Sequence, residues 1–165
     1  MDRLILFRHG KAEAGSASGD DFDRPLAPRG ARECAEMAAV LADLGLKPDA
    51  VLVSPAARTR ESWAAAEACF PDAQVSVDDA LYHADSLGIR DAAQRAGQGV
   101  GTVMVVGHNP GLQELAVRLL QEGAAPPSLT HRAQREFPTA AAAVFLFDAA
   151  GRPAYDGLFF PERGD

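Results

Sequence analysis

The chain has 165 residues, of which 47% are hydrophobic, and this is the size and composition of one globular domain with a substantial core. Its formal net charge of −7 argues against nucleic acid or an anionic membrane surface as the main partner, because either would require a basic face. No stretch is apolar over the length of a membrane span, and no basic region precedes a long apolar segment at the N-terminus. We therefore expect a single domain over residues 1–165 that is cytoplasmic and monomeric.

The first predicted strand is the apolar run from Leu4 to Phe7, which stops at Arg8, His9 and Gly10. Four consecutive apolar residues are typical of a parallel strand covered on both faces, and ligands gather at the carboxyl ends of such strands. An arginine there offers a planar fork of donors to phosphate oxygens, and a neutral imidazole beside it can attack phosphorus. Gly10 would let the backbone come close to the ligand.

Residues 11–28 are rich in Gly, Ser and Asp, a composition that predicts an irregular loop near the end of this strand. We expect the three carboxylates of the loop to be solvated surface groups: those of Asp20, Asp21 and Asp23. Lys11 and Arg24 lie near the strand end in sequence and can add positive charge there. The alternative for both is an exposed charge without a role.

Apolar residues recur at three- and four-residue spacing over residues 29–44, which predicts a helix. The next apolar run, residues 50–53, predicts a second strand. Ser54 suits the N-cap of the helix that follows, and Pro55 suits its first position. Arg58 would then lie in the first turn, where the backbone N–H groups already favour an anion.

A third apolar run, residues 103–106, predicts another strand, which leads into Gly-His-Asn-Pro-Gly. We expect Asn109 to cap the next helix, with Pro110 at its first position. His108 stands just before that cap. Each of three predicted strand ends thus carries residue types that a phosphoryl-transfer site needs.

The C-terminal third is less informative. Residues 86–98 predict a polar helix, residues 123–138 an exposed Pro-rich loop, and residues 140–147 and 154–160 two closing strands joined by a hairpin turn. Alternating strands and helices predict an α/β three-layer sandwich, with a mostly parallel central sheet and helices on both faces. One or two antiparallel strands are expected at its C-terminal edge.

Taken together, these segments resemble the histidine phosphatase superfamily, also called the phosphoglycerate mutase-like group. The matching pieces are residues 6–10, residues 53–55 followed by Arg58 and Thr59, and residues 106–111. Within the superfamily, the short chain and the segment Asp-Arg-Pro-Leu at positions 23–26 are most similar to the small bacterial phosphohistidine phosphatases, which are SixA-like. The resemblance implies the phosphoglycerate mutase-like fold.

The resemblance also implies roles for individual residues. His9 would be the nucleophile that takes the phosphoryl group, and three side chains would bind its oxygens: those of Arg8, Arg58 and His108. Neighbouring arginines disfavour a protonated His9, so the imidazole should stay neutral near pH 7. Water would then hydrolyse the phosphoenzyme, and we expect no metal and no other cofactor.

The remaining candidates are substrate-binding residues. Arg24 matches a position near the pocket mouth in the small phosphohistidine enzymes, Lys11 adjoins the first matching piece, and Asn109 lies within the third. Many superfamily members carry a carboxylate as proton donor where this chain has His83. His83 or Asp85 would then either donate the proton or lie only on the rim of the pocket.

This difference bears on the substrate. An alkoxide that leaves a phosphate ester needs a proton in the transition state, whereas a P–N bond to imidazole breaks more readily. We therefore expect phosphohistidine hydrolysis on a protein, a phosphorelay or phosphotransfer component. The alternatives are a phosphomonoesterase acting on a small phosphorylated molecule, and a non-catalytic module that binds phosphate or a phosphoprotein.

Overall fold

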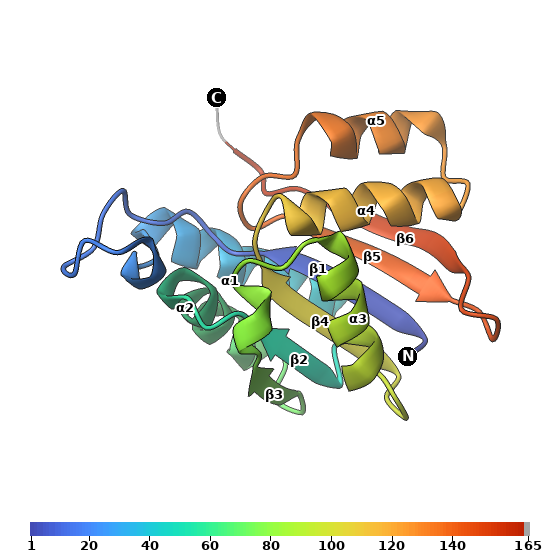
Figure 1. Cartoon of the computed structure of the whole chain (residues 1–165), viewed down its shortest axis with the longest axis horizontal. Helices are drawn as coiled ribbons and strands as arrows, with labels where there is room; N and C mark the ends of the chain where they lie inside the picture. The colour runs from blue at the N-terminus through green and yellow to red at the C-terminus, as the bar shows by residue number, and fades with distance from the viewer. Residues whose placement is uncertain (164–165) are drawn as a thin grey trace.

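The computed structural model describes residues 1–163, and this part of the chain folds around one six-stranded sheet (Figure 1). The strands are β1 (Arg3–Arg8), β2 (Ala50–Val53), β3 (Gln74–Val77), β4 (Thr102–Gly107), β5 (Ala142–Phe147) and β6 (Pro153–Phe159). The α-helices are α1 (Pro28–Asp43), α2 (Ala57–Ala66), α3 (Ser86–Ala96), α4 (Gly111–Glu122) and α5 (Pro127–Arg135). Short 3₁₀ turns lie at η1 (Asp21–Asp23), η2 (Glu67–Cys69) and η3 (Asp79–Leu81).

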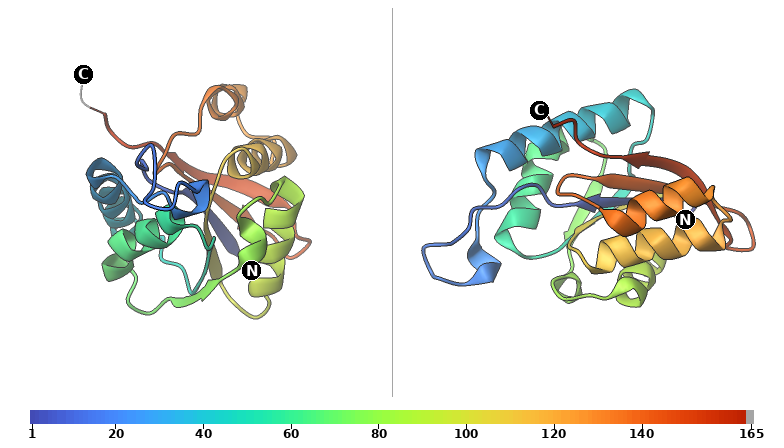
Figure 2. Two further views of the ribbon diagram at one scale, coloured as in Figure 1. Left: turned by 60° about the vertical axis from the view of Figure 1, so that its left-hand side comes forward. Right: turned by 90° about the horizontal axis from the view of Figure 1, so that it is seen from above.

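The strand order is β3-β2-β4-β1-β5-β6. The first four strands of that order pair in parallel, whereas β5 pairs antiparallel with β1, and β6 pairs antiparallel with β5. Helices lie on both sides of the sheet, with α1 and α2 on one face and α3, α4 and α5 on the other (Figure 2). The predicted α/β three-layer sandwich with antiparallel strands at the C-terminal edge is therefore confirmed.

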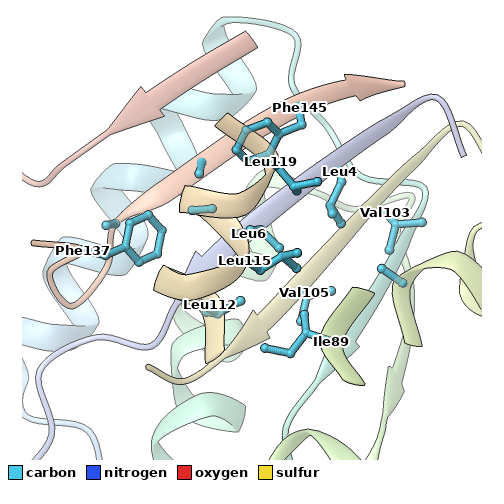
Figure 3. Packing of buried hydrophobic residues seen from close by; sticks show 14 of the residues in the cluster. Leu4, Leu6, Ile89, Val103, Val105, Leu112, Leu115, Leu119, Phe137 and Phe145 are labelled. Atoms are coloured by element: carbon cyan, nitrogen blue, oxygen red, sulfur yellow. The ribbon is translucent and has the colours of Figure 1, made fainter. Parts of the chain in front are cut away.

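The central strand β1 shows how the sequence builds this arrangement. Because side chains alternate across a strand, Leu4 and Leu6 point to the layer of α3 and α4, and Ile5 and Phe7 point to the layer of α1 and α2. All four are essentially inaccessible to solvent. Figure 3 shows the first of these clusters, where leucines of α4 pack on β1 and β4. This strand has no solvated face, so its apolar run is uninterrupted.

Both predicted helix caps are wrong. α2 begins at Ala57, three residues after Ser54, and α4 begins at Gly111, after Asn109 and Pro110. Neither of the predicted capping side chains bonds to a helix N–H, because both are engaged elsewhere. The Ser54 hydroxyl lies against His108, and the Asn109 amide donates to a main-chain carbonyl outside α4.

Two elements differ from the sequence pattern. α5 lies within the segment that predicts a loop, and it packs on the outer side of α4. It buries only Ala133, so its sequence carries no apolar stripe at helical spacing. β3 is a short edge strand whose four residues are all exposed, and its pattern predicts no strand.

Packing against α1 requires a glycine at position 10. A Cβ at this position would lie 2.6 Å from the carbonyl oxygen of Gly30 and 2.9 Å from the sulfur of Cys34, both on α1. The start of α1 thus rests directly on the backbone that follows His9. Within the described residues, no helix is both long and apolar enough to cross a membrane.

Candidate active site

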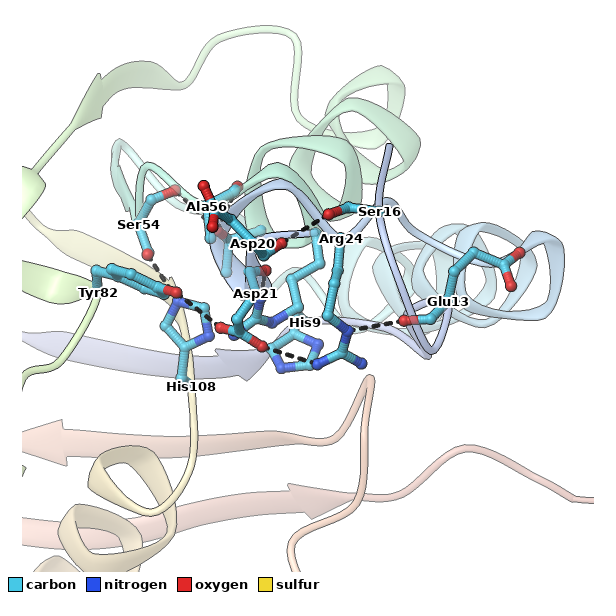
Figure 4. A network of polar contacts seen from close by, with 12 residues as sticks. His9, Glu13, Ser16, Asp20, Asp21, Arg24, Ser54, Ala56, Tyr82 and His108 are labelled. Atoms are coloured by element: carbon cyan, nitrogen blue, oxygen red, sulfur yellow. Dashed lines mark hydrogen bonds and ion pairs between the residues drawn. The ribbon is translucent and has the colours of Figure 1, made fainter. Parts of the chain in front are cut away.

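Three parallel strands bring the candidate residues to one edge of the sheet. β1 pairs with β4 so that Arg8 lies opposite Gly107, and the next residue on each strand is a histidine. β2 lies on the other side of β4 and ends just before Ser54. The imidazole rings of His9 and His108 consequently lie 5.3 Å apart between centroids (Figure 4).

The environment of His9 fixes which of its nitrogens is free. Nδ1 lies 2.7 Å from the carbonyl oxygen of Gly10. Because a carbonyl oxygen only accepts, Nδ1 carries the proton and Nε2 keeps its lone pair. Burial, followed by the positive charges of Arg8 and Arg58, lowers the pKa of His9 to about 4. The ring is therefore neutral at pH 7, with Nε2 available as a nucleophile.

His108 is held by the residue that follows β2. Its Nε2 lies 2.7 Å from the hydroxyl oxygen of Ser54, which is fully buried. Burial lowers the pKa of His108 to about 3, so the ring is neutral. Nδ1 is buried without a hydrogen-bond partner among residues 1–163. If Ser54 donates to Nε2, Nδ1 carries the proton and is a donor for an oxyanion.

Arg8 is the last residue of β1 and directly precedes His9. Its Nη1 donates to the carbonyl oxygen of Phe137 at 2.9 Å, and Nδ2 of Asn109 donates to the same oxygen at 2.9 Å. The connection between α5 and β5 is thereby tied to the ends of β1 and β4. The amide nitrogen of Asn109 is thus occupied by a contact within the protein.

Arg58 reaches the site from the first turn of α2, as its sequence position predicts, and is 8% exposed. Its Nη1 donates to the main-chain oxygen of Asp21 at 2.9 Å, and its Nη2 donates to Oδ2 of the same residue at 3.1 Å. The expectation that Asp21 is merely a solvated surface group is therefore wrong. Its carboxylate is half exposed but belongs to the site.

Two further side chains meet at that carboxylate. Tyr82, which follows η3, donates its hydroxyl to Oδ2 at 2.7 Å, and Nη1 of Arg24 donates to Oδ1 at 2.9 Å. These hydrogen bonds, from Tyr82 first and then from Arg24, hold the pKa of Asp21 well below its usual range. Figure 4 shows Asp21 between Tyr82 and Arg24, beside the two imidazoles.

The other candidates lie further out. The Lys11 side chain is exposed, whereas its main-chain oxygen accepts from Ala27. His83 is exposed and its ring packs against that of Tyr82, with ring centroids 4.1 Å apart and the ring planes tilted by 32°. The Asp85 carboxylate caps α3 by accepting from Gly88 N at 2.8 Å, so it has a structural role in that helix.

The motifs alone do not reveal three of these residues. Ser54 belongs to a matching piece, but its residue type indicates a helix cap and not a contact with His108, and Tyr82 carries no signal that separates it from a core aromatic. Asp21 has one signal, its i,i+3 spacing from Arg24, with which it forms an ion pair. Over residues 1–163, no group of three or more His, Cys, Asp or Glu side chains is arranged to hold a metal ion.

Comparison with known proteins agrees with this geometry. A model of the histidine phosphatase superfamily (branch 1) matches residues 4–86, which include β1, α2 and the loop between β1 and α1. An uncharacterized protein of Mycobacterium tuberculosis is 36% identical over 124 residues, which cover 75% of this chain and 77% of that protein.

Solved structures resemble the chain over nearly its whole length. A structure from Agrobacterium tumefaciens, assigned as a phosphohistidine phosphatase SixA, matches with a TM-score of 0.84 and 30% identity, covering 97% of this chain and 98% of that one. The protein histidine phosphatase SixA in complex with tungstate matches with a TM-score of 0.75 and 26% identity, covering 94% and 95%. The likeness to SixA that the sequence motifs indicate is therefore confirmed.

Proposed function

The chain belongs to the histidine phosphatase superfamily, and from this premise we propose that it hydrolyses phosphohistidine on another protein by way of a phosphorylated His9. The observation that carries the proposal is the placement of His9. Its Nδ1 is occupied by the Gly10 carbonyl, its Nε2 is free, and its pKa is lowered to about 4. A neutral imidazole with a fixed tautomer is a competent nucleophile toward phosphorus.

The proposed cycle has two displacements at phosphorus. Nε2 of His9 first attacks the phosphoryl group, and the P–N bond to the substrate imidazole breaks as that imidazole leaves and takes a proton from water. A water molecule then attacks the phosphorus of phospho-His9, which releases inorganic phosphate and restores neutral His9. In both steps the negative oxygens would lie against Arg8, Arg58 and His108.

The carboxylates near the site favour a substrate with a P–N bond. Hydrogen bonds keep Asp21 ionised, and the Asp85 carboxylate caps a helix. The ionised Asp21 has no proton to give a leaving alkoxide, and the Asp85 carboxylate is occupied at the start of α3, whereas an imidazole leaving group depends less on a proton donor. The likeness to SixA structures, one of them holding the tetrahedral oxyanion tungstate, supports the same substrate class. Arg24 is a further binding residue in this proposal, while Lys11, His83 and Asn109 have weaker claims.

Rapid-quench trapping tests the proposal directly. The wild type and His9→Ala are mixed with a phosphohistidine-carrying phosphotransfer protein labelled in its phosphoryl group, and quenched samples are analysed for label on the enzyme. We expect an acid-labile phosphoenzyme in the wild type and none in His9→Ala.

Parallel assays with p-nitrophenyl phosphate separate the alternatives. Turnover of the ester alone would indicate a phosphomonoesterase, and binding of phosphate without turnover of either substrate would indicate a binding module.

A further inference from the structure

The loop between β1 and α1 is fastened to the site through one residue that the proposed chemistry does not use. Asp21 accepts from Nη1 of Arg58 through its main-chain oxygen and from Nη2 of Arg58 through Oδ2. The same Oδ2 accepts from the Tyr82 hydroxyl, and Oδ1 accepts from Nη1 of Arg24. Asp21 therefore joins the loop, α2 and the segment after η3.

Packing of apolar side chains contributes little to the contact between the loop, α2 and the segment after η3. η1, which carries Asp21, has no buried residue, and Phe22 beside it is 36% exposed. The edge of Phe22 meets the Tyr82 ring with centroids 5.0 Å apart. Since the turn has no apolar core of its own, the hydrogen bonds of Asp21 decide where it lies relative to α2.

The arginines that Asp21 holds are those that surround the proposed nucleophile. The positive charges of Arg58 and Arg24, together with that of Arg8, all lower the pKa of His9. A guanidinium has more N–H groups than these contacts use, so Arg24 and Arg58 keep donors for a phosphoryl group. Two close guanidinium groups also repel each other, and a carboxylate between them offsets that repulsion.

Building on the proposed function, we propose that Asp21 is a positioning residue, whose carboxylate holds Arg24 and Arg58 in the orientation that binds the phosphoryl group at His9. Tyr82 is the third anchor, because its hydroxyl fixes the oxygen that Arg58 also contacts. Asp21 is not the proton donor to a leaving group, since its hydrogen bonds keep it ionised at neutral pH.

The same contacts allow an opposite arrangement, in which the Asp21 carboxylate competes with phosphate for the arginines. The two roles, positioning and competing, predict opposite changes in KM when the Asp21 carboxylate is removed. Removal of a positioning carboxylate weakens substrate binding, whereas removal of a competing one strengthens it. The main-chain contact from Arg58 favours positioning, because the loop is attached by more than the anionic group.

The test compares Asp21→Asn, Asp21→Ala and Asp21→Glu with Asp23→Asn. Asp23 lies in the same turn, and its carboxylate accepts from the exposed Ser18 hydroxyl, away from the arginines, so its variant is a matched control. Steady-state kinetics are measured with p-nitrophenyl phosphate and phenyl phosphate, and tungstate binding is measured by calorimetry. Asp21→Ala should lose up to about a hundredfold in kcat/KM, the scale expected when a binding group is misplaced by about 1 Å.

We expect most of that loss to come from a rise in KM, with a parallel rise in the Kd for tungstate. The fold-change in kcat/KM should be the same for both esters. Asp21→Asn should fall between the wild type and Asp21→Ala, Asp21→Glu should recover part of the loss, and Asp23→Asn should match the wild type. An unchanged or lower KM in Asp21→Asn would overturn the inference, as would a loss far larger with phenyl phosphate, which would make Asp21 a proton donor.

Thermal melts separate misfolding from misplacement. Should Asp21→Ala melt early, Asp21→Asn, which has nearly the same shape, carries the comparison. A wild type that neither turns over substrate nor binds tungstate would refute the proposed function and this inference together. An active wild type with an unaffected Asp21→Asn would refute the positioning role alone.

Discussion

The rings of His9 and His108 lie 5.3 Å apart because each follows a strand end and the two strands are parallel neighbours in the sheet. Both rings are buried to more than nine-tenths of their surface. An imidazolium in this position would lose hydration and face several arginines, so both rings are neutral in the folded protein. Activity and stability should each depend on pH for this reason.

Activity should persist to unusually low pH for a histidine nucleophile. The pKa of His9 is lowered to about 4, so the neutral ring remains dominant well below the usual histidine pKa of about 6.5. We expect kcat/KM, corrected for ionisation of the substrate, to fall only as the pH drops through about 4. The measurement is a pH profile with p-nitrophenyl phosphate. An acid limb centred near pH 6.5 would contradict the assigned environment of His9.

The free energy of unfolding should rise as the pH increases from the acid limb of the activity profile toward neutrality. The folded-state pKa values of His9 and His108 lie below the unfolded value, so the unfolded chain binds more protons between about pH 4 and pH 6.5. The free energy of unfolding should therefore increase across this range and lose that contribution as the pH falls. Urea titrations at several pH values measure it. The double variant His9→Asn with His108→Asn should show a shallower slope, whereas His131→Asn, on the exposed side of α5, should keep the wild-type slope.

Ser54→Ala should reduce activity through His108. The hydroxyl of Ser54 is fully buried and lies 2.7 Å from Nε2 of His108. Its removal leaves that nitrogen without its partner and frees the ring to change tautomer, at a cost of about 1 to 3 kcal/mol for an unsatisfied buried group. We expect a loss in kcat/KM of about tenfold, or 1.4 kcal/mol. Ser128→Ala, at an exposed position on α5, is the control. Activity equal to that of the wild type would show that Ser54 does not orient His108.

Much of this arrangement can be predicted from the sequence because it depends on local patterns. An uninterrupted apolar run indicates a buried parallel strand, and parallel strands place their carboxyl ends at one edge. The residues after β1 and β4 are therefore expected to meet, and Arg58 follows from its place in the first turn after β2. The structure brings these side chains together at that edge, while their roles in catalysis stay predictions.

The remainder depends on contacts that no local pattern encodes. Ser54 has the residue type of a cap, but its hydroxyl is used by His108 on the neighbouring strand. Asp21 and Tyr82 meet through two irregular segments far apart in the chain. α5 escapes prediction because a helix that buries only Ala133 shows no apolar periodicity. Tertiary pairing decides each of these cases.

Gly10→Ala should destabilise the fold and also impair the site. The added Cβ would lie 2.6 Å from the Gly30 carbonyl oxygen and 2.9 Å from the Cys34 sulfur, and the main chain of α1 leaves little room to adjust. We expect a loss of about 1 to 3 kcal/mol in the free energy of unfolding, measured in urea, as for overpacked cores. Because the Gly10 carbonyl also accepts from Nδ1 of His9, activity should fall under conditions where the variant remains folded.

Gly15→Ala provides the matched control for that substitution. A Cβ at Gly15 meets no other atom of the described chain within 4 Å, and the residue lies in the exposed part of the loop. Its free energy of unfolding should stay within about 0.5 kcal/mol of the wild type. Equal stability of the two variants would show that α1 moves freely away from Gly10.

His83 and Asp85 should respond differently, because one lies beside the site and the other caps a helix. His83 packs against Tyr82 and is open to solvent, so when protonated it can assist a leaving alkoxide. We expect His83→Ala to reduce hydrolysis of phenyl phosphate more than hydrolysis of phosphohistidine, whose leaving imidazole needs less assistance. Asp85→Ala should instead lower stability by about 1 kcal/mol through loss of the α3 cap, with similar effects on both substrates. Kinetics with the two substrates, combined with urea unfolding, make the comparison. Equal losses on both substrates in His83→Ala would leave His83 as a rim residue without a part in proton transfer.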